Sequence, residues 1–425
     1  MNPRDLNAAY RRQDADTPWL APSWCNGPDN PDNAHAMSAH DADMIVRTVS
    51  VGDIKSHDVQ QWCNLADATP GDNPFAEPWM MLPALQHYAS QASTMGCPEI
   101  LIVQHADGPW IGIMPVGKSA KFGRLPVSHR FGWHVPNQFL GTPLVRPGTE
   151  HLFWQKILSF IDNQPDTGPL LHITNCAADS PVVAALSHIC EHQNRPLHIT
   201  SWHDRAAFAA TIAQGTAHPV RGKDHARLRT LSRRLEAEFG PVMVHTLAPQ
   251  TDCTSWIDAF LELEAKGWKG KSGSALSQAA ASAQFFRDTM TQGHVLGRVK
   301  ACKLTAGDTL VAMNWQISGA NAGFGFKMAF DETYAAYAPG LLLLDEVCRD
   351  VETMPLTLFD SCASPKAQYL NRRWKGRRRI VNLAIGIGKR ENSLKYLPFH
   401  MIMASISTWH RIKSTLYQLR GAWRR

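Results

Sequence analysis

Apolar positions follow a helical period in some segments of the chain and form short runs in others. Met80, Leu82, Leu85 and Tyr88 mark one helical segment, because residues three or four positions apart share a face of a helix. This period predicts helices at 59–65, 79–92, 151–163, 221–239, 254–265, 281–292 and 340–352. Short apolar runs bounded by turn residues predict strands at 44–51, 100–105, 110–116, 170–174, 242–247, 295–304, 309–318, 323–330 and 356–360. Helices and strands in this mixed order predict an α/β (α+β) fold of mixed sheets flanked by helices.

The order of these elements is similar in the two halves of the chain. Residues 101–116, "LIVQHADGPWIGIMPV", and residues 302–317, "CKLTAGDTLVAMNWQI", both indicate a strand, a tight polar turn and a second strand, each preceded by helices. We therefore expect two related domains, at 44–200 and 201–392. Residues 1–43 are rich in Asp, Asn, Pro, Ala and His without a sustained apolar period, which predicts a mobile N-terminal extension.

The last segment, 393–425, has the pattern of a basic amphipathic helix. Its apolar residues recur at helical spacing, at Ile402, Ile406, Trp409, Ile412, Leu416, Leu419 and Trp423. Its basic residues are Arg411, Lys413, Arg420, Arg424 and Arg425. Such a helix either lies on an anionic membrane or packs on its own domain, and packing is the favoured interpretation.

Composition narrows the class of protein. With 44% hydrophobic and 19% charged residues in 425, the chain is globular, and it holds no run of roughly 18 to 20 uncharged apolar residues that could span a membrane. The charged segment 1–24 lacks the apolar core of a secretory signal, so we expect a cytoplasmic protein. Nine widely spaced cysteines form neither a disulfide framework nor a metal-binding spacing, and no metal is expected. The net charge of +6 favours an anionic partner: nucleic acid, a phosphorylated cofactor or a membrane.

One segment concentrates this charge. Residues 366–379, "KAQYLNRRWKGRRR", hold seven basic residues and no acid around Tyr369 and Trp374. Basic side chains beside aromatic ones can bind nucleic acid or the phosphates of a coenzyme. A solvated turn between two strands fits the pattern as well.

Three segments resemble a known family. "LEAKGWKGKSGSAL" at 263–276, "FFRD" at 285–288 and "GFKMAFDETYAAYAPGLLLLDEV" at 325–347 are similar to the acetyltransferases of the cellulose-biosynthesis (BcsL/CelD-like) type. These are a branch of the GNAT superfamily related to the FemAB-like tandem GNAT proteins. The resemblance covers about 44–383 and implies two tandem GNAT-like domains, with an acyltransferase that uses acetyl-CoA or another acyl-CoA as donor.

The resemblance also implies a place for the donor. In a GNAT fold two neighbouring strands splay apart, the pantetheine arm lies in the gap, and the next helix points its N-terminus at the pyrophosphate. Here 309–318 and 323–330 would be the splayed strands. The expected donor contacts are Asn314, Gln316, Pro339, Gly340 and Leu341. The loop holds a single glycine, and the strand 309–318 lacks the acid that often serves as the base.

Acyl transfer needs a group that accepts a proton and donors that stabilise an oxyanion. Asp360 matches an Asp of the family pattern and is the first candidate for a base or substrate-orienting carboxylate, and Glu264 is the next. Lys327 or Lys269 could hold an anionic group or polarise a carbonyl. The expected catalytic residues are therefore Asp360, Glu264 and Lys327. The expected acceptor contacts are Trp268, Lys269, Asn137, Tyr337 and Trp374.

Each of these residues also has an ordinary structural interpretation. A strand-end Asp is often a turn residue, Glu264 could pair with Lys266 or Lys269 on a helix surface, and Trp268 and Trp374 could belong to the core. By family analogy the acceptor is a small molecule or glycan, such as a sugar or polysaccharide precursor, or a lipid-linked intermediate, bound by a monomer or homodimer. The alternatives are a FemAB-like aminoacyl transferase that uses charged tRNA, and a non-catalytic scaffold without affinity for CoA.

Overall fold

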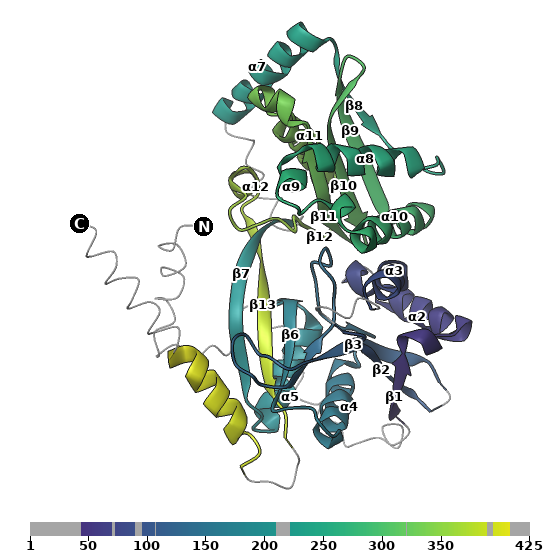
Figure 1. The fold of residues 1–425 in the computed structure, drawn as a ribbon, viewed down its shortest axis with the longest axis vertical. Helices are drawn as coiled ribbons and strands as arrows, with labels where there is room; N and C mark the ends of the chain where they lie inside the picture. The colour runs from purple at the N-terminus through teal and green to yellow at the C-terminus, as the bar shows by residue number, and fades with distance from the viewer. Residues whose placement is uncertain are drawn as a thin grey trace, which may run out of the picture.

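The computed structural model describes residues 44–69, 73–89, 96–106, 108–209, 222–319, 321–388 and 394–408 (Figure 1). The predicted N-terminal extension and the tail after residue 408 lie outside these ranges.

The first half contains the predicted strands and helices, together with elements at 129–132, 144–145, 181–192 and 197–209 that the sequence pattern did not predict. Its elements are β1 (Met44–Ser50), η2 (Val51–Asp53), α2 (Ser56–Ala68), η3 (Pro74–Ala76), α3 (Pro78–Tyr88), β2 (Glu99–His105), β3 (Trp110–Ser119), β4 (His129–Gly132), β5 (Leu144–Val145), α4 (Glu150–Asn163), β6 (Leu170–Ala177), α5 (Pro181–His192) and β7 (Leu197–Ala209). The hairpin of β2 and β3 confirms the strand pair predicted around Asp107 and Gly108.

The second half begins with an additional helix and then follows a similar order of strands and helices. Its elements are α7 (Gly222–Phe239), β8 (Val242–Thr246), α8 (Thr254–Lys266), α9 (Trp268–Lys271), η4 (Leu276–Gln278), α10 (Ala280–Val295), β9 (Val299–Ala306), β10 (Thr309–Ser318), β11 (Ala322–Phe330), η5 (Glu332–Tyr337), α11 (Pro339–Thr353), β12 (Leu358–Asp360), α12 (Gln368–Arg373) and β13 (Gly376–Gly386). The strand expected to begin at 295 begins at Val299 instead, because the helix α10 continues through the apolar residue Val295.

The strands pair into one sheet in the order β1-β2-β3-β4-β6-β13-β7-β12-β11-β10-β9-β8, with β5 beside β3. In each half four consecutive strands pair antiparallel, and a helical crossover then leads to a parallel strand. The crossover is α4 between β4 and β6 in the first half, and α11 between β11 and β12 in the second. The shared order confirms the predicted repeat of two α/β halves.

The last strand of each half pairs with the sheet of the other half. β7 lies between β13 and β12, while β13 lies between β6 and β7. The boundary expected between residues 200 and 201 therefore falls inside β7. The basic segment 366–379, for which a solvated turn was one of three interpretations, contains α12 and the start of β13, in which Arg378 is buried while Arg377 and Arg379 are exposed.

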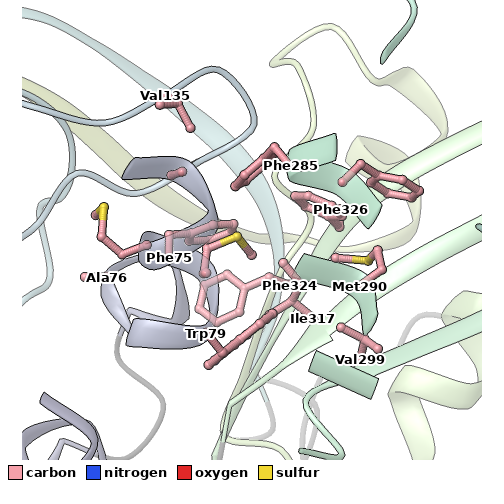
Figure 2. Close-up of a cluster of buried hydrophobic side chains, with 14 of the residues drawn as sticks. Phe75, Ala76, Trp79, Val135, Phe285, Met290, Val299, Ile317, Phe324 and Phe326 are labelled. Atoms are coloured by element: carbon pink, nitrogen blue, oxygen red, sulfur yellow. The ribbon is translucent and has the colours of Figure 1, made fainter. Parts of the chain in front are cut away.

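Helices on one face of the sheet join the two halves. α2 and α3 of the first half pack in the same hydrophobic cluster as α8 and α10 of the second. Figure 2 shows Phe75 and Trp79 beside Phe324, with Phe285 and Met290 of α10 opposite. The rings of Phe75 and Phe324 meet edge to face with centroids 5.6 Å apart. This shared core fixes the position of the first half against the second.

The opposite face of the sheet is covered separately in each half. α4 and α5 cover the first half, whereas α7, α11 and α12 cover the second. Residues 397–408 are helical and pack on the first half, which confirms the favoured interpretation for this part of the tail. Within the described ranges, no helix combines the length and apolar character that crossing a membrane requires.

Candidate functional site

The parallel strands β11 and β12 separate after three residue pairs. Their pairing ends at Phe324 and Asp360, whereas β11 continues to Phe330. β10 and β11 instead stay paired from Ala312 to Ser318, with one bulge between Trp315 and Gln316. The expectation that 309–318 and 323–330 splay apart is therefore wrong. These strands form a hydrogen-bonded hairpin, while β12 ends two residues before Cys362, whose φ is 48°.

A cavity of about 180 Å³ lies at this separation. Strands β10 and β11, the end of β12, and helices α11 and α12 supply its walls. The lining residues are Asn314, Gln316, Gly325, Phe326, Lys327, Met328, Leu344, Val347, Phe359, Ser361, Cys362, Ala363, Leu370 and Trp374. A largely apolar group with a few polar atoms fits such a lining.

Two buried amides form the polar part of this wall. Asn314 and Gln316 are 6% and 4% exposed, and Asn314 Oδ1 accepts no hydrogen bond from the described residues. A buried acceptor without a partner is costly, so this oxygen is suited to an N–H or O–H of a ligand. The structure thus brings both predicted donor contacts of β10 to the cavity.

The start of α11 lies outside the cavity lining. Pro339 is the first residue of the helix and follows Ala338, whose φ is 51°. A Cβ on Gly340 would lie 3.0 Å from the ring of Phe330, so close packing explains this glycine. Pro339, Gly340 and Leu341 are all absent from the lining residues.

Lys327 connects the cavity with the first half. Its Nζ donates a hydrogen bond to Oδ1 of Asn137, which lies in the connection between β4 and β5. Burial, together with the nearby charge of Lys269, lowers the pKa of Lys327 to about 8, and Glu264 partly opposes this effect. An ammonium group at the border of the cavity can stabilise negative charge that develops there.

Glu264 holds Lys269 beside this group. The Glu264 side chain is buried; Oε1 accepts a hydrogen bond from Lys269 Nζ at 2.6 Å and Oε2 accepts one from the backbone N–H of Leu276 at 2.8 Å. Both carboxylate oxygens are thus occupied. The sequence-based pairing of Glu264 with Lys269 is present, but the pair is buried on the Glu264 side rather than exposed on a helix surface.

Asp360 has no exposed surface. Its Oδ2 lies 3.4 Å from Nη1 of Arg205 and 3.5 Å from Nη1 of Arg378, and its Oδ1 accepts the backbone N–H of Cys362 at 2.8 Å. Arg205 also donates to the carbonyl oxygen of Phe139 in the first half at 2.8 Å. Asp360 thereby joins the end of β12 to β7, β13 and the first half.

The predicted aromatic contacts lie in different places. Trp374 is buried in the cavity wall against Phe359, whereas Trp268 is 58% exposed on α9. The hydroxyl of Tyr337 donates to Glu238, outside the cavity lining. The structure therefore brings Asn137, Lys269, Glu264 and Lys327 together and leaves Tyr337 apart from them.

Most of the basic side chains at 366–379 contact acidic groups or carbonyl oxygens of the protein itself. Arg372 pairs with Asp224, Arg373 with Asp345 and Glu352, and Arg379 with Asp204. Arg378 lies beside Asp179 and Asp360, and Arg377 donates to the carbonyl oxygens of Asn371, Trp374 and Gly376. These partners neutralise much of the charge that the sequence pattern offered to nucleic acid.

The first half has no comparable cavity at the end of β4 among the described residues: the space there, lined by β3, the end of β4 and the connection to β5, measures only about 20 Å³. The backbone N–H of Gly141 donates to the carbonyl oxygen of Asn175, and a Cβ on Gly141 would lie 2.2 Å from the carbonyl oxygen of Thr174. The connection between β4 and β5 therefore fills this space in the first half, while its Asn137 contributes to the site of the second.

Gly325 allows the close approach at the start of the cavity. A Cβ at this position would lie 2.4 Å from the carbonyl oxygen of Ser361. We expect Gly325→Ala to lower the free energy of unfolding by about 1 to 3 kcal/mol through overpacking. Urea unfolding should show this loss, while Gly52→Ala, where no atom lies within 4 Å, should cost less than about 1 kcal/mol. Equal stability of the two variants would contradict the close packing of β11 against Ser361.

Comparison with known proteins identifies the second half. Residues 222–375 match the family model of the acetyltransferase (GNAT) domain. This half is a GNAT-type acyltransferase domain. GNAT domains use acyl-CoA donors, and the separation of β11 and β12 lies inside the matched segment.

Solved structures resemble a larger part of the chain. A conserved protein of unknown function from Bacteroides thetaiotaomicron is 10% identical, with a TM-score of 0.48 over 79% of this chain and 98% of its own. L-PGS from Bacillus licheniformis is 14% identical, with a TM-score of 0.47 over 81% and 94%. A tandem GNAT protein from the clavulanic acid biosynthesis pathway is 14% identical, with a TM-score of 0.39 over 82% and 100%. No curated protein matches the chain.

Proposed function

We propose that the protein transfers the acyl group of acetyl-CoA or another acyl-CoA to an amine or hydroxyl acceptor that enters between the two halves. The observation that carries this proposal is the cavity of about 180 Å³ where β11 and β12 separate. Helices α11 and α12 border it on one face of the sheet, and Lys327 connects it to Asn137 on the other. A donor and an acceptor could thus reach the same point from opposite faces.

The cavity walls suit the arm of a CoA thioester. Leu344 and Val347 offer apolar contact to its methylene groups, and the amide oxygen of Asn314 offers an acceptor to an amide N–H of the arm. In this arrangement the thioester carbonyl lies near Lys327.

Lys327 would act on the reacting carbonyl as a cation. When the acceptor nitrogen or oxygen bonds to the thioester carbon, negative charge develops on the carbonyl oxygen before the carbon–sulfur bond breaks. The Lys327 ammonium stabilises this charge, Asn137 holds the ammonium in place by its hydrogen bond, and Glu264 offsets part of the repulsion from Lys269. The acceptor loses one proton and the departing sulfur gains one.

The acceptor is expected to carry polar or anionic groups. Lys269 and Lys327 place two cationic side chains beside Asn137, which is the side from which the acceptor would enter. A sugar or an exopolysaccharide precursor fits this chemistry and agrees with the resemblance to the acetyltransferases of the cellulose-biosynthesis type.

Calorimetric titration of the full chain with acetyl-CoA, longer acyl-CoAs and free CoA tests the proposal. We expect micromolar binding of a thioester and a loss of about tenfold or more in Ala363→Leu, because the larger side chain fills the cavity that Ala363 lines. Ala184→Leu on the exposed face of α5 is the matched control and should bind as the unchanged protein does.

Absence of thioester binding would reject the proposal. Binding of charged tRNA with a steep salt dependence would then favour the FemAB-like aminoacyl transferase. Absence of both would favour a scaffold protein.

A further inference from the structure

The helix at 397–408 carries apolar side chains on two faces. Phe399, Ile402 and Met403 are buried in a cluster with Phe122 and Leu170 of the first half. On other positions of the same helix, Leu397 and Met401 are 50% and 61% exposed. They lie one turn apart, at i and i+4, and so share one side of the helix.

The buried face fixes the direction of the exposed one. Phe399 is 2% exposed, and Ile402 and Met403 are 8% exposed, so the helix cannot rotate Leu397 and Met401 inward without exposing these three side chains. In Figure 1 this yellow helix lies at the side of the first half, separate from the helices that join the two halves. Leu397 and Met401 thus form an outward apolar pair on a fixed support.

Exposed lysines flank, in the sequence, the cluster on which this helix packs. Lys121 directly precedes Phe122, which packs in the cluster beneath the helix, and both Lys118 and Lys121 are exposed. The sequence has no Asp or Glu between residues 108 and 149, and none between 392 and 425. Within the described residues 394–408, the second of these segments holds Lys395 as its one lysine or arginine.

We propose that Lys118, Lys121, Leu397 and Met401, here termed the tail face, dock the protein on the surface of an anionic lipid bilayer. Apolar side chains enter the boundary between headgroups and acyl chains, while lysines attract anionic headgroups. A second copy of the chain fits this surface poorly, because it would bring two sets of the same basic residues together. The acceptor would then be presented to the acyltransferase at a membrane surface.

Co-sedimentation of the full chain with vesicles tests this surface without an activity measurement. We expect binding to vesicles of phosphatidylcholine mixed with phosphatidylglycerol, little binding to phosphatidylcholine alone, and weaker binding as salt is added. Failure to bind the mixed vesicles, or equal binding to both kinds, would overturn the proposal. Neither result would bear on donor binding, so this experiment and the test of the proposed function are independent.

Paired variants locate the contact. The double substitution L397Q/M401Q should lower partitioning onto mixed vesicles by about tenfold or more, because it removes two apolar side chains from the contact. The matched control is V295Q/L296Q, which alters two residues that are 81% and 57% exposed at the end of α10 and should leave binding unchanged. Unchanged binding of L397Q/M401Q would overturn the assignment.

The lysines and the oligomeric state supply the remaining checks. K118E/K121E should lower binding to mixed vesicles by about tenfold or more, whereas K366E/K375E in the second half should lower it far less. Light scattering in the absence of lipid shows whether a second copy of the chain covers the tail face instead. If the unchanged protein is a dimer and L397Q/M401Q is a monomer, docking on lipid is overturned.

Discussion

Replacing Lys327 with methionine is expected to lower kcat/KM for acyl transfer by about 10²- to 10³-fold, as loss of one oxyanion-stabilising donor does in other enzymes. Methionine keeps the length of the side chain but removes the ammonium group beside the cavity. Donor affinity measured by calorimetry should change far less, because the lost interaction forms mainly in the transition state. The control is Lys300→Met on β9, which removes an exposed ion pair with Asp350. This variant should retain the activity of the unchanged protein.

The pH dependence of the reaction separates two roles for Lys327. Its pKa is lowered to about 8, so the side chain is charged below that pH and loses its proton as the pH rises through it. If the cation is the active form, kcat/KM should fall above about pH 8. Lys327→Arg should keep part of the activity and lose this fall, since arginine stays charged at these pH values.

The opposite profile would overturn the cationic role. A rate that rises through pH 8 and then levels off, together with an inactive Lys327→Arg variant, would mean that neutral Lys327 accepts the proton of the acceptor. If kcat/KM depends on pH in the same way in the unchanged protein and in Lys327→Arg, Lys327 takes no part in the reaction.

Local patterns in the sequence predicted most of the individual elements. The hairpins β2–β3 and β9–β10 have short apolar runs around polar turns, and this signal is contained within about sixteen residues. The helical periods of α2, α4, α8 and α11 are equally local. The repeat was predictable from these elements, because similar local patterns occur in both halves of the sequence.

The centre of the sheet could not be predicted in this way. β13 pairs with β6 and β7, and its Arg377 and Arg379 point to solvent, so its first residues resemble a solvated segment rather than a strand. Its place in the sheet depends on partners about 170 to 215 residues earlier in the chain, such as Trp202 opposite Val381. Sequence periodicity contains no information on such pairing.

The site was predicted in part. Asn314, Gln316, Lys327 and Trp374 reach the cavity, and the first three lie on strands that the sequence pattern predicted. Arg205 was missed, because β7 has no strong apolar alternation and its partner Asp360 is 155 residues away. The burial of Asp360 depends on this contact, so the sequence could not distinguish a reactive carboxylate from a buried counter-ion.

Asp360→Asn is expected to lower the free energy of unfolding by about 3 to 5 kcal/mol, because it leaves Arg205 and Arg378 buried without their shared anion. Asparagine keeps the shape and can still accept the backbone N–H of Cys362, so the change isolates the charge. Urea unfolding measures the loss. Asp179→Asn, which removes the 44% exposed partner of Arg378, is the matched control and should cost less than about 1 kcal/mol.

The same variant decides between the two interpretations of Asp360. A carboxylate with no exposed surface, set between two guanidinium groups, should matter for stability first and for catalysis only through the position of Ser361 and Cys362 at the cavity. Adding Arg205→Met to Asp360→Asn should then restore part of the lost stability, because one unpaired buried charge is removed. An Asp360→Asn variant that unfolds like the unchanged protein, binds thioester normally and still loses turnover would instead make Asp360 the proton acceptor of the reaction.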